Sequence, residues 1–339
     1  MSWLSGYKYR VKIPCTATSA GTQTNYTKKI TIVKGSGTNS AGTVYLQNHA
    51  LNWPNDIRFT KSDGVTLLDH YREEHDPTDG SWWVELDSIG ESGDTNFYIY
   101  YGNDSDTDAS NGPNSFIFFD DGELGNLSRW TTAGACWSAQ DITKVEGSYG
   151  IKGSGGATGR ELSKTISTGK SVIIHTYCRF TETSATVFYV NYPKTGLNKI
   201  LVALVMQNGE FKYVTNSPTY SSLPTPTAYS ANTWYLAEVA IDNKNQLFRW
   251  WIDGQSKGSS ALKDYQNNAI STTDYIALVR SYANDSVNYN GHLDQYWIRA
   301  YAYPEPAWAS PSAEGQLAQL RRLGDGLVGT GPLVGSGLI

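Results

Sequence analysis

The chain has 339 residues, more than one ordinary hydrophobic core needs, and this length favours two domains. Aromatic residues make up 13% of the chain and charged residues only 17%, a balance typical of strands. The formal net charge of -5, without a cluster of lysines and arginines, argues against nucleic acid as a ligand. The three cysteines, Cys15, Cys136 and Cys178, lack metal spacing and are an odd number for disulfides, so we expect small buried apolar residues.

Residues 1–6 do not have the basic start and apolar core of a secretion signal, and no run approaches the ~20 apolar residues of a membrane span. We therefore expect a protein made without a secretion signal and without membrane insertion. Its composition nevertheless resembles that of extracellular proteins. A virion protein, or one exposed on an extracellular surface, reconciles the two observations.

The first strand is predicted by strict alternation. Tyr7, Tyr9, Val11 and Ile13 share one face, and the lysines and arginine between them share the other. Further short apolar runs follow between turn signals, at 29–33, 44–47, 57–60, 67–73, 82–86 and 96–101. Short strands at this spacing predict an antiparallel β-sandwich.

A polar, turn-rich stretch, NDSDTDASNGPNS at 103–115, is the best candidate for a linker. It predicts a first domain at 1–115, and we expect a protease to cut within it. A new apolar run begins at Phe116 and opens a second domain, 116–305. The predicted strands of this domain are 171–180, 186–191, 200–206, 211–214, 275–280, 293–301 and the hairpin at 233–254.

Two of these strands show which side chains face the core. In 171–180 the residues at even positions face inward, leaving Ile173, His175, Tyr177 and Arg179 on the opposite face. In the hairpin, the residues at even positions from Trp234 to Ala240 share one face, and those at odd positions from Tyr235 to Ile241 share the other. Large side chains on both faces predict a strand in the middle of a sheet that is covered on both sides. Asn208-Gly209 and Asp253-Gly254 predict tight turns.

The last segment, 306–339, differs in composition. Ser310 and Pro311 suit the start of a helix of about three turns, with Ala313, Leu317 and Leu320 on one face. A Gly-rich tail follows, in which apolar pairs recur between glycines and cannot form a core of their own. We expect this segment to be an assembly anchor that contacts copies of the chain or other virion proteins. The residues assigned to it are Leu317, Leu320, Leu327, Val328, Leu333 and Val334.

The first 120 residues contain several separate motifs: WLSGYKYR at 3–10, DIRFTKSDG at 56–64 and FYIYYGN at 97–103, with Leu67-Leu68, Glu73-Glu74 and Trp83-Val84. In this order the motifs resemble a β-sandwich domain family of unknown function. That family commonly precedes laminin-G-like or concanavalin-like domains in archaeal, bacterial and phage surface proteins, and the resemblance implies no catalytic residues.

The second half resembles a concanavalin-like, laminin-G-like jelly roll. The resemblance rests on Phe119-Asp120-Asp121, Trp234-Tyr235, WIDG at 251–254 and LDQYWIR at 293–299. These are core and turn features. The fold class predicted for the whole chain is all-β, with two antiparallel β-sandwich domains, the second a jelly roll, a short C-terminal helix and a Gly-rich tail.

The chemistry of an enzyme is not apparent. Laminarinase-like hydrolases share the jelly-roll fold and need carboxylates spaced as Glu-x-Asp-x-x-Glu on one strand, a motif that is absent here. A Ser nucleophile elbow is absent as well. We therefore predict no catalytic residues and no enzyme. The alternative is a polysaccharide hydrolase or lyase of the same fold that uses an unrecognised carboxylate pair, for which Glu238 is the test residue.

Metal-binding patterns are weak. His70, Glu74 and Asp76 would share a strand face, but a solvated edge explains them better. Asp104, Asp106 and Asp108 alternate as in a calcium loop, yet Ala109 and Ser115 replace the glycine and glutamate that such a loop needs. We predict no cofactor. Calcium elsewhere in the jelly roll is compatible with the sequence, which does not locate it.

The remaining type of site is one in which aromatic side chains bind a ligand. A sugar ring presents apolar C–H faces, so an indole or phenol beside polar groups suits it. The candidates near loops are Trp137, Tyr220, Tyr229 and Tyr282. The sequence predicts a non-enzymatic surface or virion structural protein that binds a cell-surface glycan, or adheres, through its jelly roll.

Overall fold

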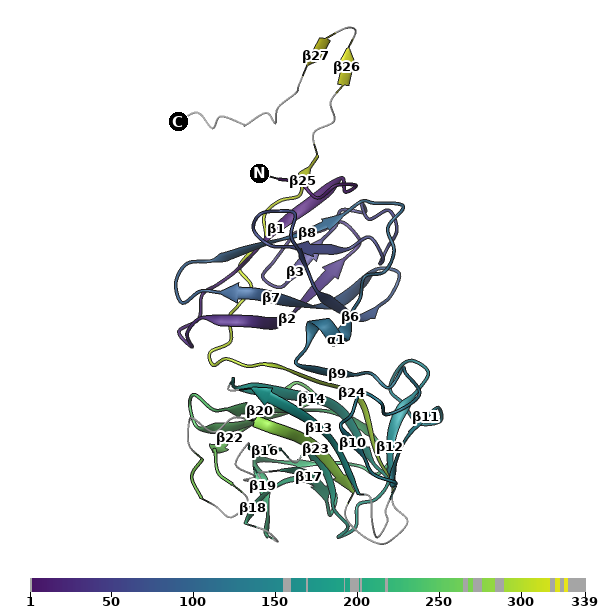
Figure 1. The fold of residues 1–339 in the computed structure, drawn as a ribbon, viewed down its shortest axis with the longest axis vertical. Helices are drawn as coiled ribbons and strands as arrows, with labels where there is room; N and C mark the ends of the chain where they lie inside the picture. The colour runs from purple at the N-terminus through teal and green to yellow at the C-terminus, as the bar shows by residue number, and fades with distance from the viewer. Residues whose placement is uncertain are drawn as a thin grey trace. The chain divides into compact units, whose positions relative to one another are not determined.

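The computed structural model describes residues 2–154, 160–168, 170–191, 193–195, 201, 203–216, 219–264, 268–270, 276–283, 290–317, 321–323 and 326–328. The chain forms two compact units (Figure 1). Unit 1 comprises Met1–Thr24, Lys28–Asn111 and Pro306–Ile339, and unit 2 comprises Asn25–Thr27 and Gly112–Glu305. The C-terminal segment, which the sequence sets apart as a third region, therefore clusters with the first unit.

Unit 1 is built from two sheets. One has the order β25-β1-β8-β4-β5 and the other the order β3-β2-β7-β6. The strands are β1 Tyr9–Cys15, β2 Gln23–Val33, β3 Thr43–Tyr45, β4 Arg58–Thr60, β5 Leu67–Leu68, β6 His70–His75, β7 Asp79–Ile89, β8 Thr95–Tyr101 and β25 Gly315–Gln316. Strand β1 buries Val11, Ile13 and Cys15 and exposes Lys12, which confirms the predicted alternation.

The predicted C-terminal helix is wrong for the residues up to Leu317. In Figure 1 strand β25 lies beside β1, and the two pair antiparallel. The amides of Ser312 and Leu317 donate to the carbonyls of Lys12 and Lys8, at 2.8 and 2.9 Å. A helix of three turns is marginal alone, whereas this extended segment satisfies the unpaired backbone groups along the edge of β1.

The residues assigned to an assembly anchor fall mostly beyond this strand. The side chain of Leu317 is 44% exposed. The backbones of Leu327 and Val328 lie in β27 (Gly326–Val328), which pairs with β26 (Arg321–Leu323). Leu320, Leu333 and Val334 lie outside the described residues.

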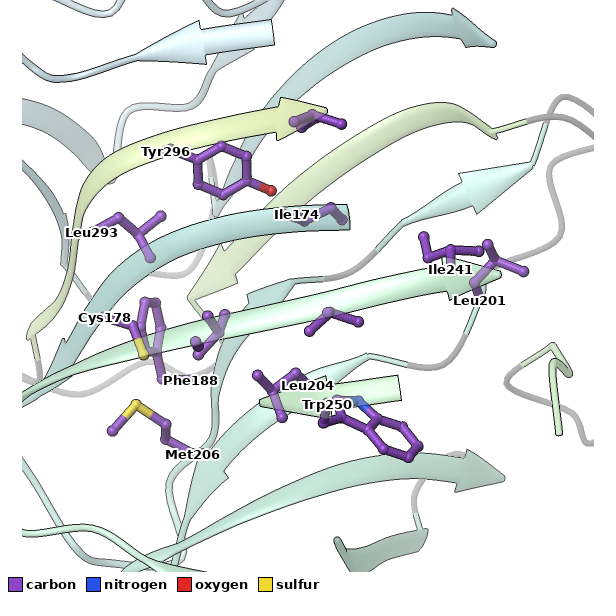
Figure 2. Close-up of a cluster of buried hydrophobic side chains, with 14 of the residues drawn as sticks. Ile174, Cys178, Phe188, Leu201, Leu204, Met206, Ile241, Trp250, Leu293 and Tyr296 are labelled. Atoms are coloured by element: carbon purple, nitrogen blue, oxygen red, sulfur yellow. The ribbon is translucent and has the colours of Figure 1, made fainter. Parts of the chain in front are cut away.

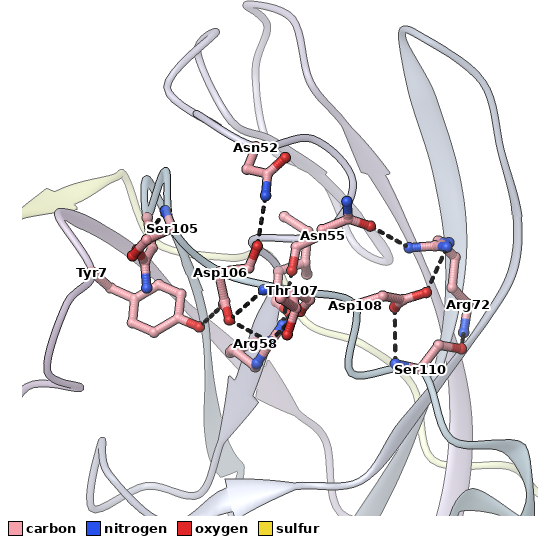
Figure 3. Close-up of polar contacts among 12 residues, drawn as sticks. Tyr7, Asn52, Asn55, Arg58, Arg72, Ser105, Asp106, Thr107, Asp108 and Ser110 are labelled. Atoms are coloured by element: carbon pink, nitrogen blue, oxygen red, sulfur yellow. Dashed lines mark hydrogen bonds and ion pairs between the residues drawn. The ribbon is translucent and has the colours of Figure 1, made fainter.

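The predicted linker is anchored to unit 1 over much of its length (Figure 3). Asp106 forms an ion pair with Arg58 at 2.6 Å and accepts a hydrogen bond from the hydroxyl of Tyr7. Asp108 pairs with Arg72 at 2.8 Å. Helix α1 (Gly112–Ser115) then occupies the last residues of the stretch. The stretch is polar because its carboxylates bind arginines, and we no longer expect it to be the first site of protease cleavage.

Unit 2 is a sandwich of two antiparallel sheets. The β14 sheet has the order β11-β12-β24-β14-β20-β21-β22, with β9 beside β24. Its strands are β9 Phe118–Asp120, β11 Trp137–Gln140, β12 Gly150–Ser154, β14 Val172–Phe180, β20 Trp234–Asp242, β21 Leu247–Ile252, β22 Gln255–Ala261 and β24 Asn290–Ala300.

The facing β23 sheet has the order β10-β13-β23-β15-β17-β18-β19, with β16 beside β23. Its strands are β10 Thr132–Ala133, β13 Glu161–Thr168, β15 Phe188–Asn191, β16 Lys194–Thr195, β17 Leu204–Gln207, β18 Glu210–Asn216, β19 Thr219–Ala228 and β23 Ile276–Ala283. Strand β19, which the sequence presents as a Pro-rich loop, lies at the sheet edge. Pro224 and Pro226 are tolerated there because an edge strand leaves some amides unpaired.

The core of unit 2 lies between its two sheets. Figure 2 shows Ile174, Cys178, Trp250, Phe188 and Met206 gathered in one cluster, to which strands β14 and β21 of one sheet and strands β15 and β17 of the other contribute. The predicted inward face of the strand at 171–180 is thereby confirmed. The strand at 234–241 divides its side chains between two faces as predicted, and the structure places Ala237, Val239 and Ile241 in the core. Asn208-Gly209 and Asp253-Gly254 adopt positive φ at both residues, as tight hairpin turns require. Cys15, Cys136 and Cys178 are free thiols.

Candidate functional site

Two of the four predicted glycan platforms are core residues. Trp137 is 6% exposed, packs in the unit 2 core and donates its indole N–H to the carbonyl of Arg160 at 2.9 Å. Tyr229 is 5% exposed, and its hydroxyl donates to the carbonyl of Glu182. Their polar atoms bind the backbone and their rings fill the core, so neither offers a face to a sugar. For these two residues the prediction was wrong.

The other two platforms do not join them. Tyr220, in β19, is half-buried, and its hydroxyl lies 2.9 Å from that of Tyr189. The backbone of Tyr282 pairs with Glu161 and Tyr189, and its side chain lies outside the described residues. Trp137 belongs to the β14 sheet and Tyr220 to the β23 sheet. The predicted residues therefore do not form one site.

A different set of side chains comes together on the outer face of the β14 sheet, the face turned away from the core. The strand registers pair Trp234 with Arg179, Arg179 with His292, His292 with Lys152, and Lys152 with Ser138. Directly paired residues point to the same face of a sheet. These five residues form one row across five strands, which we call the Trp234 row.

The row combines an aromatic ring with cations. Trp234, Arg179 and Lys152 are half-buried, so their outer surfaces reach solvent. The ring of Trp234 meets that of His292 edge-on, with centroids 6.3 Å apart. The guanidinium of Arg179 donates to both oxygens of Asn232, at 3.0 and 2.7 Å. These bonds hold the guanidinium against Asn232, two residues before Trp234 in the chain.

His292 lies at the centre of the row and is 4% exposed. Its Nδ1 has no hydrogen-bond partner among the residues that the structure describes. Burial, and then the positive charges of Arg179 and Lys152, lower the pKa of His292 to about 4. Burial also lowers the pKa of Arg179. The imidazole is therefore neutral near pH 7, and a buried polar nitrogen in a cationic setting is left unsatisfied.

On the same face, the row of Tyr177, Leu236 and Asp294 adjoins the Trp234 row, and the row after it, which contains His175, is covered. His175 pairs in register with Glu238 on one side and Trp297 on the other. Its Nδ1 lies 3.2 Å from Glu238, and its ring stacks on Trp297 at 4.0 Å. Trp297 is completely buried, stacked against Phe116. In the row formed by Glu238, His175 and Trp297, only Glu238 carries a carboxylate. Glycoside hydrolysis needs two carboxylates.

Asp294 anchors the loop beside the Trp234 row. It is 1% exposed, and its carboxylate accepts hydrogen bonds from the amides of Val145 and Gln295 at 2.6 and 2.8 Å. Burial raises the pKa of Asp294 to about 7, against the lowering effect of these amides. The carboxylate holds residues 145–146 against the sheet, and ionising it costs folding free energy.

The folded-state pKa of Asp294 lies above its unfolded value of about 4, so protonation favours the folded state. This stabilisation is present below pH 4 and is lost as the pH rises through about 7. We expect unit 2 to lose on the order of 2–4 kcal/mol between pH 4.5 and 8, and Asp294→Asn to remove that slope. Asp294→Asn also loses one hydrogen-bond acceptor, which changes the free energy of unfolding at every pH. The quantity to compare between the two proteins is therefore how that free energy changes with pH. Urea unfolding with EDTA present measures it, and equal slopes in both proteins would contradict the assignment.

The described residues contain no group of three or more His, Cys, Asp or Glu side chains placed to hold a metal. In the aspartate series at 104–108, Asp106 and Asp108 are bound to different arginines. His70 is buried, while Glu74 and Asp76 are exposed, so these three do not converge.

In the part of the chain that the structure describes, no helix is long and apolar enough to span a membrane.

Comparison with known families identifies part of the chain. Residues 53–133 match DUF2341, a domain of unknown function. The match confirms the predicted resemblance to a domain family of unknown function. DUF2341 thus covers Arg58, Arg72 and the anchored stretch at 103–111, all of which serve the structure of unit 1. The search of curated proteins found no match.

Several solved structures are similar in fold. The cellulose-induced protein Cip1 is 15% identical over 54% of this chain and 97% of its own, with a TM-score of 0.43. The carbohydrate esterase vb_24B_21 from the Shiga toxin-encoding bacteriophage phi24B is 14% identical over 55% and 99%, with a TM-score of 0.44. The receptor-binding domain of botulinum neurotoxin D is 11% identical over 49% and 44%, with a TM-score of 0.35. The likeness concerns the β-sandwich architecture alone.

The residues of the Trp234 row carry no local motif. Period-two alternation already places Arg179 and Trp234 on outward faces. Aligning them with His292 and Lys152 needs the pairing of strands more than 100 residues apart. That pairing is set by the sandwich topology.

Proposed function

We propose that this chain is a non-enzymatic, glycan-binding protein of a virion or extracellular surface, and that its ligand binds at the Trp234 row. The observation that supports the proposal is the half-buried indole of Trp234 beside the guanidinium of Arg179 on an outer sheet face. An indole packs against the C–H face of a sugar, while nearby donors bind its hydroxyl groups. The strands hold these groups in place before the ligand arrives, which lowers the entropic cost of binding.

The absence of catalysis is also part of the proposal. Within the described residues, the outward carboxylate of Glu238 pairs with His175, and Asp294 is held by backbone amides. Neither carboxylate faces a second one across an open cleft, as an acid and a nucleophile or base would. We include an assembly role for the residues after Leu317, whose apolar pairs need a partner surface to be buried.

A glycan array on the full chain tests the function. We expect saccharide binding without release of reducing ends, and at least tenfold weaker binding by Trp234→Ala, which corresponds to a loss of about 1.4 kcal/mol or more. Tyr303→Ala is the matched control, because Tyr303 is 51% exposed and lies over Arg249, which is outside the row. Turnover that disappears in Glu238→Gln would contradict the proposal and support the hydrolase or lyase alternative.

A further inference from the structure

Among the residues that the structure describes, no carboxylate pairs with the positive charges of the Trp234 row. The hydrogen bonds of Arg179 go to the uncharged Asn232. Lys152 forms no ion pair with any residue that the structure describes, and the charges that act on His292 are those of Arg179 and Lys152. Three other partly buried arginines of unit 2 each form an ion pair. Arg129 pairs with Asp121 at 3.0 Å, Arg249 with Asp242 at 3.6 Å and Arg299 with Glu305 at 3.3 Å.

Unmatched, half-buried cations are unfavourable for folding, because burial removes solvation without supplying a counter-charge. The row concentrates two of them around a buried imidazole whose Nδ1 lacks a partner. Such an arrangement suits an anion that arrives from outside the chain. Arg179 and Lys152 lie two strands apart, about 10 Å between backbones, so their long side chains can converge on one anionic group above His292.

Trp234, the aromatic residue of the row, indicates which kind of molecule bears the anionic group. Trp234 pairs in register with Arg179 at the end of the row, so a flat apolar surface adjoins the cationic one. A sugar ring with an acidic substituent matches both surfaces. We propose, resting on the function proposed above, that the Trp234 row binds an acidic saccharide, with its carboxylate or sulfate group between Arg179 and Lys152 and its ring packed on Trp234.

Calorimetric titration of the full chain tests this inference with three probes of equal length: an oligogalacturonate, a heparin-derived oligosaccharide and a neutral cello-oligosaccharide. We expect at least one acidic probe to bind at least tenfold more tightly than the neutral one, with affinity falling as salt is added. The oligogalacturonate and the heparin fragment distinguish a carboxylate from a sulfate ligand.

Arg179→Gln and Lys152→Gln should each weaken acidic-probe binding at least tenfold, because each removes a charge-assisted hydrogen bond. Lys152→Gln should not lower the Tm of the free protein, because it removes an unmatched charge, whereas Arg179→Gln also gives up the two hydrogen bonds to Asn232. Lys257→Gln, on strand β22, is the matched control and should bind as the parent does.

Equal binding of neutral and acidic probes, unaffected by the two substitutions, would overturn the acidic specificity and leave the glycan function standing. Binding of none of the saccharides, acidic or neutral, would count against both. An oligo-dT of similar charge that binds as tightly, with the same dependence on Arg179 and Lys152, would show a general polyanion site and overturn the inference.

Discussion

Cutting the chain after Pro306 is expected to unfold unit 1, whereas cutting it after Leu317 is expected to leave unit 1 folded. The sequence favours the opposite result for the first cut, since it presents 306–339 as a separate tail. In the structure the segment completes the sheet edge next to β1. Trp308 is 8% exposed and donates its indole N–H to the carbonyl of Lys29 at 2.6 Å.

Several further bonds would be lost with the segment. Glu314 accepts a hydrogen bond from the buried hydroxyl of Tyr101 at 2.5 Å and contacts His49 at 2.9 Å. Four backbone hydrogen bonds also link residues 307–317 to Lys8, Lys12, Pro14 and Thr16. Removal of a buried tryptophan alone costs about 3–5 kcal/mol, comparable with the whole stability of a domain. The uncovered edge of β1 would in addition favour aggregation.

Circular dichroism and urea unfolding compare the two truncated chains with the full one. The chain that ends at Leu317 keeps every contact named above and serves as the control. It also isolates the proposed assembly role of the later residues, because light scattering should show lost association in a folded protein. A chain cut after Pro306 that unfolds at the same urea concentration as the full chain would contradict the structural role of residues 307–317.

Arg58→Ala is expected to destabilise unit 1 by about 3–5 kcal/mol, the usual cost of leaving one charge of a buried pair without its partner. The side chains of Arg58 and Asp106 are 11% and 14% exposed. Arg58 also donates to the carbonyls of Thr107, Asn55 and Ile57, at 2.6, 3.0 and 2.7 Å. One guanidinium thus fastens the stretch after β8 to the sheet that contains β4.

Arg72→Ala is the matched control for this prediction. Its partner Asp108 is 44% exposed, so water replaces the lost charge and the expected cost is about 1 kcal/mol. Urea unfolding measures both variants. Limited proteolysis adds a local readout, because cleavage within residues 103–111 should appear in Arg58→Ala and not in the parent. Equal stability losses in the two variants, or cleavage at 103–111 in the parent, would show that the stretch is a free linker.

The parts of the fold that local pattern determines are predictable from the sequence. Alternation along β14 and β20 separates core residues such as Ile174 and Val239 from the outward Arg179 and Trp234. Asn208-Gly209 determines a tight turn, because few other residues adopt positive φ at low cost. Each of these features depends on neighbours in the sequence, which the alternation and the turn residues describe directly.

Tertiary structure decided the features that depend on distant partners. Trp137 and Tyr229 resemble loop platforms in sequence, yet the packing of two sheets buries both. Residues 310–317 have the composition of a short helix, but the open edge of β1 supplies more hydrogen bonds than an isolated helix could retain. The Trp234 row arises because β11, β12, β24, β14 and β20 align residues that are separated in the sequence. Its charge and its aromatic surface exist only in that register, since a shift of one residue would turn each side chain to the other face.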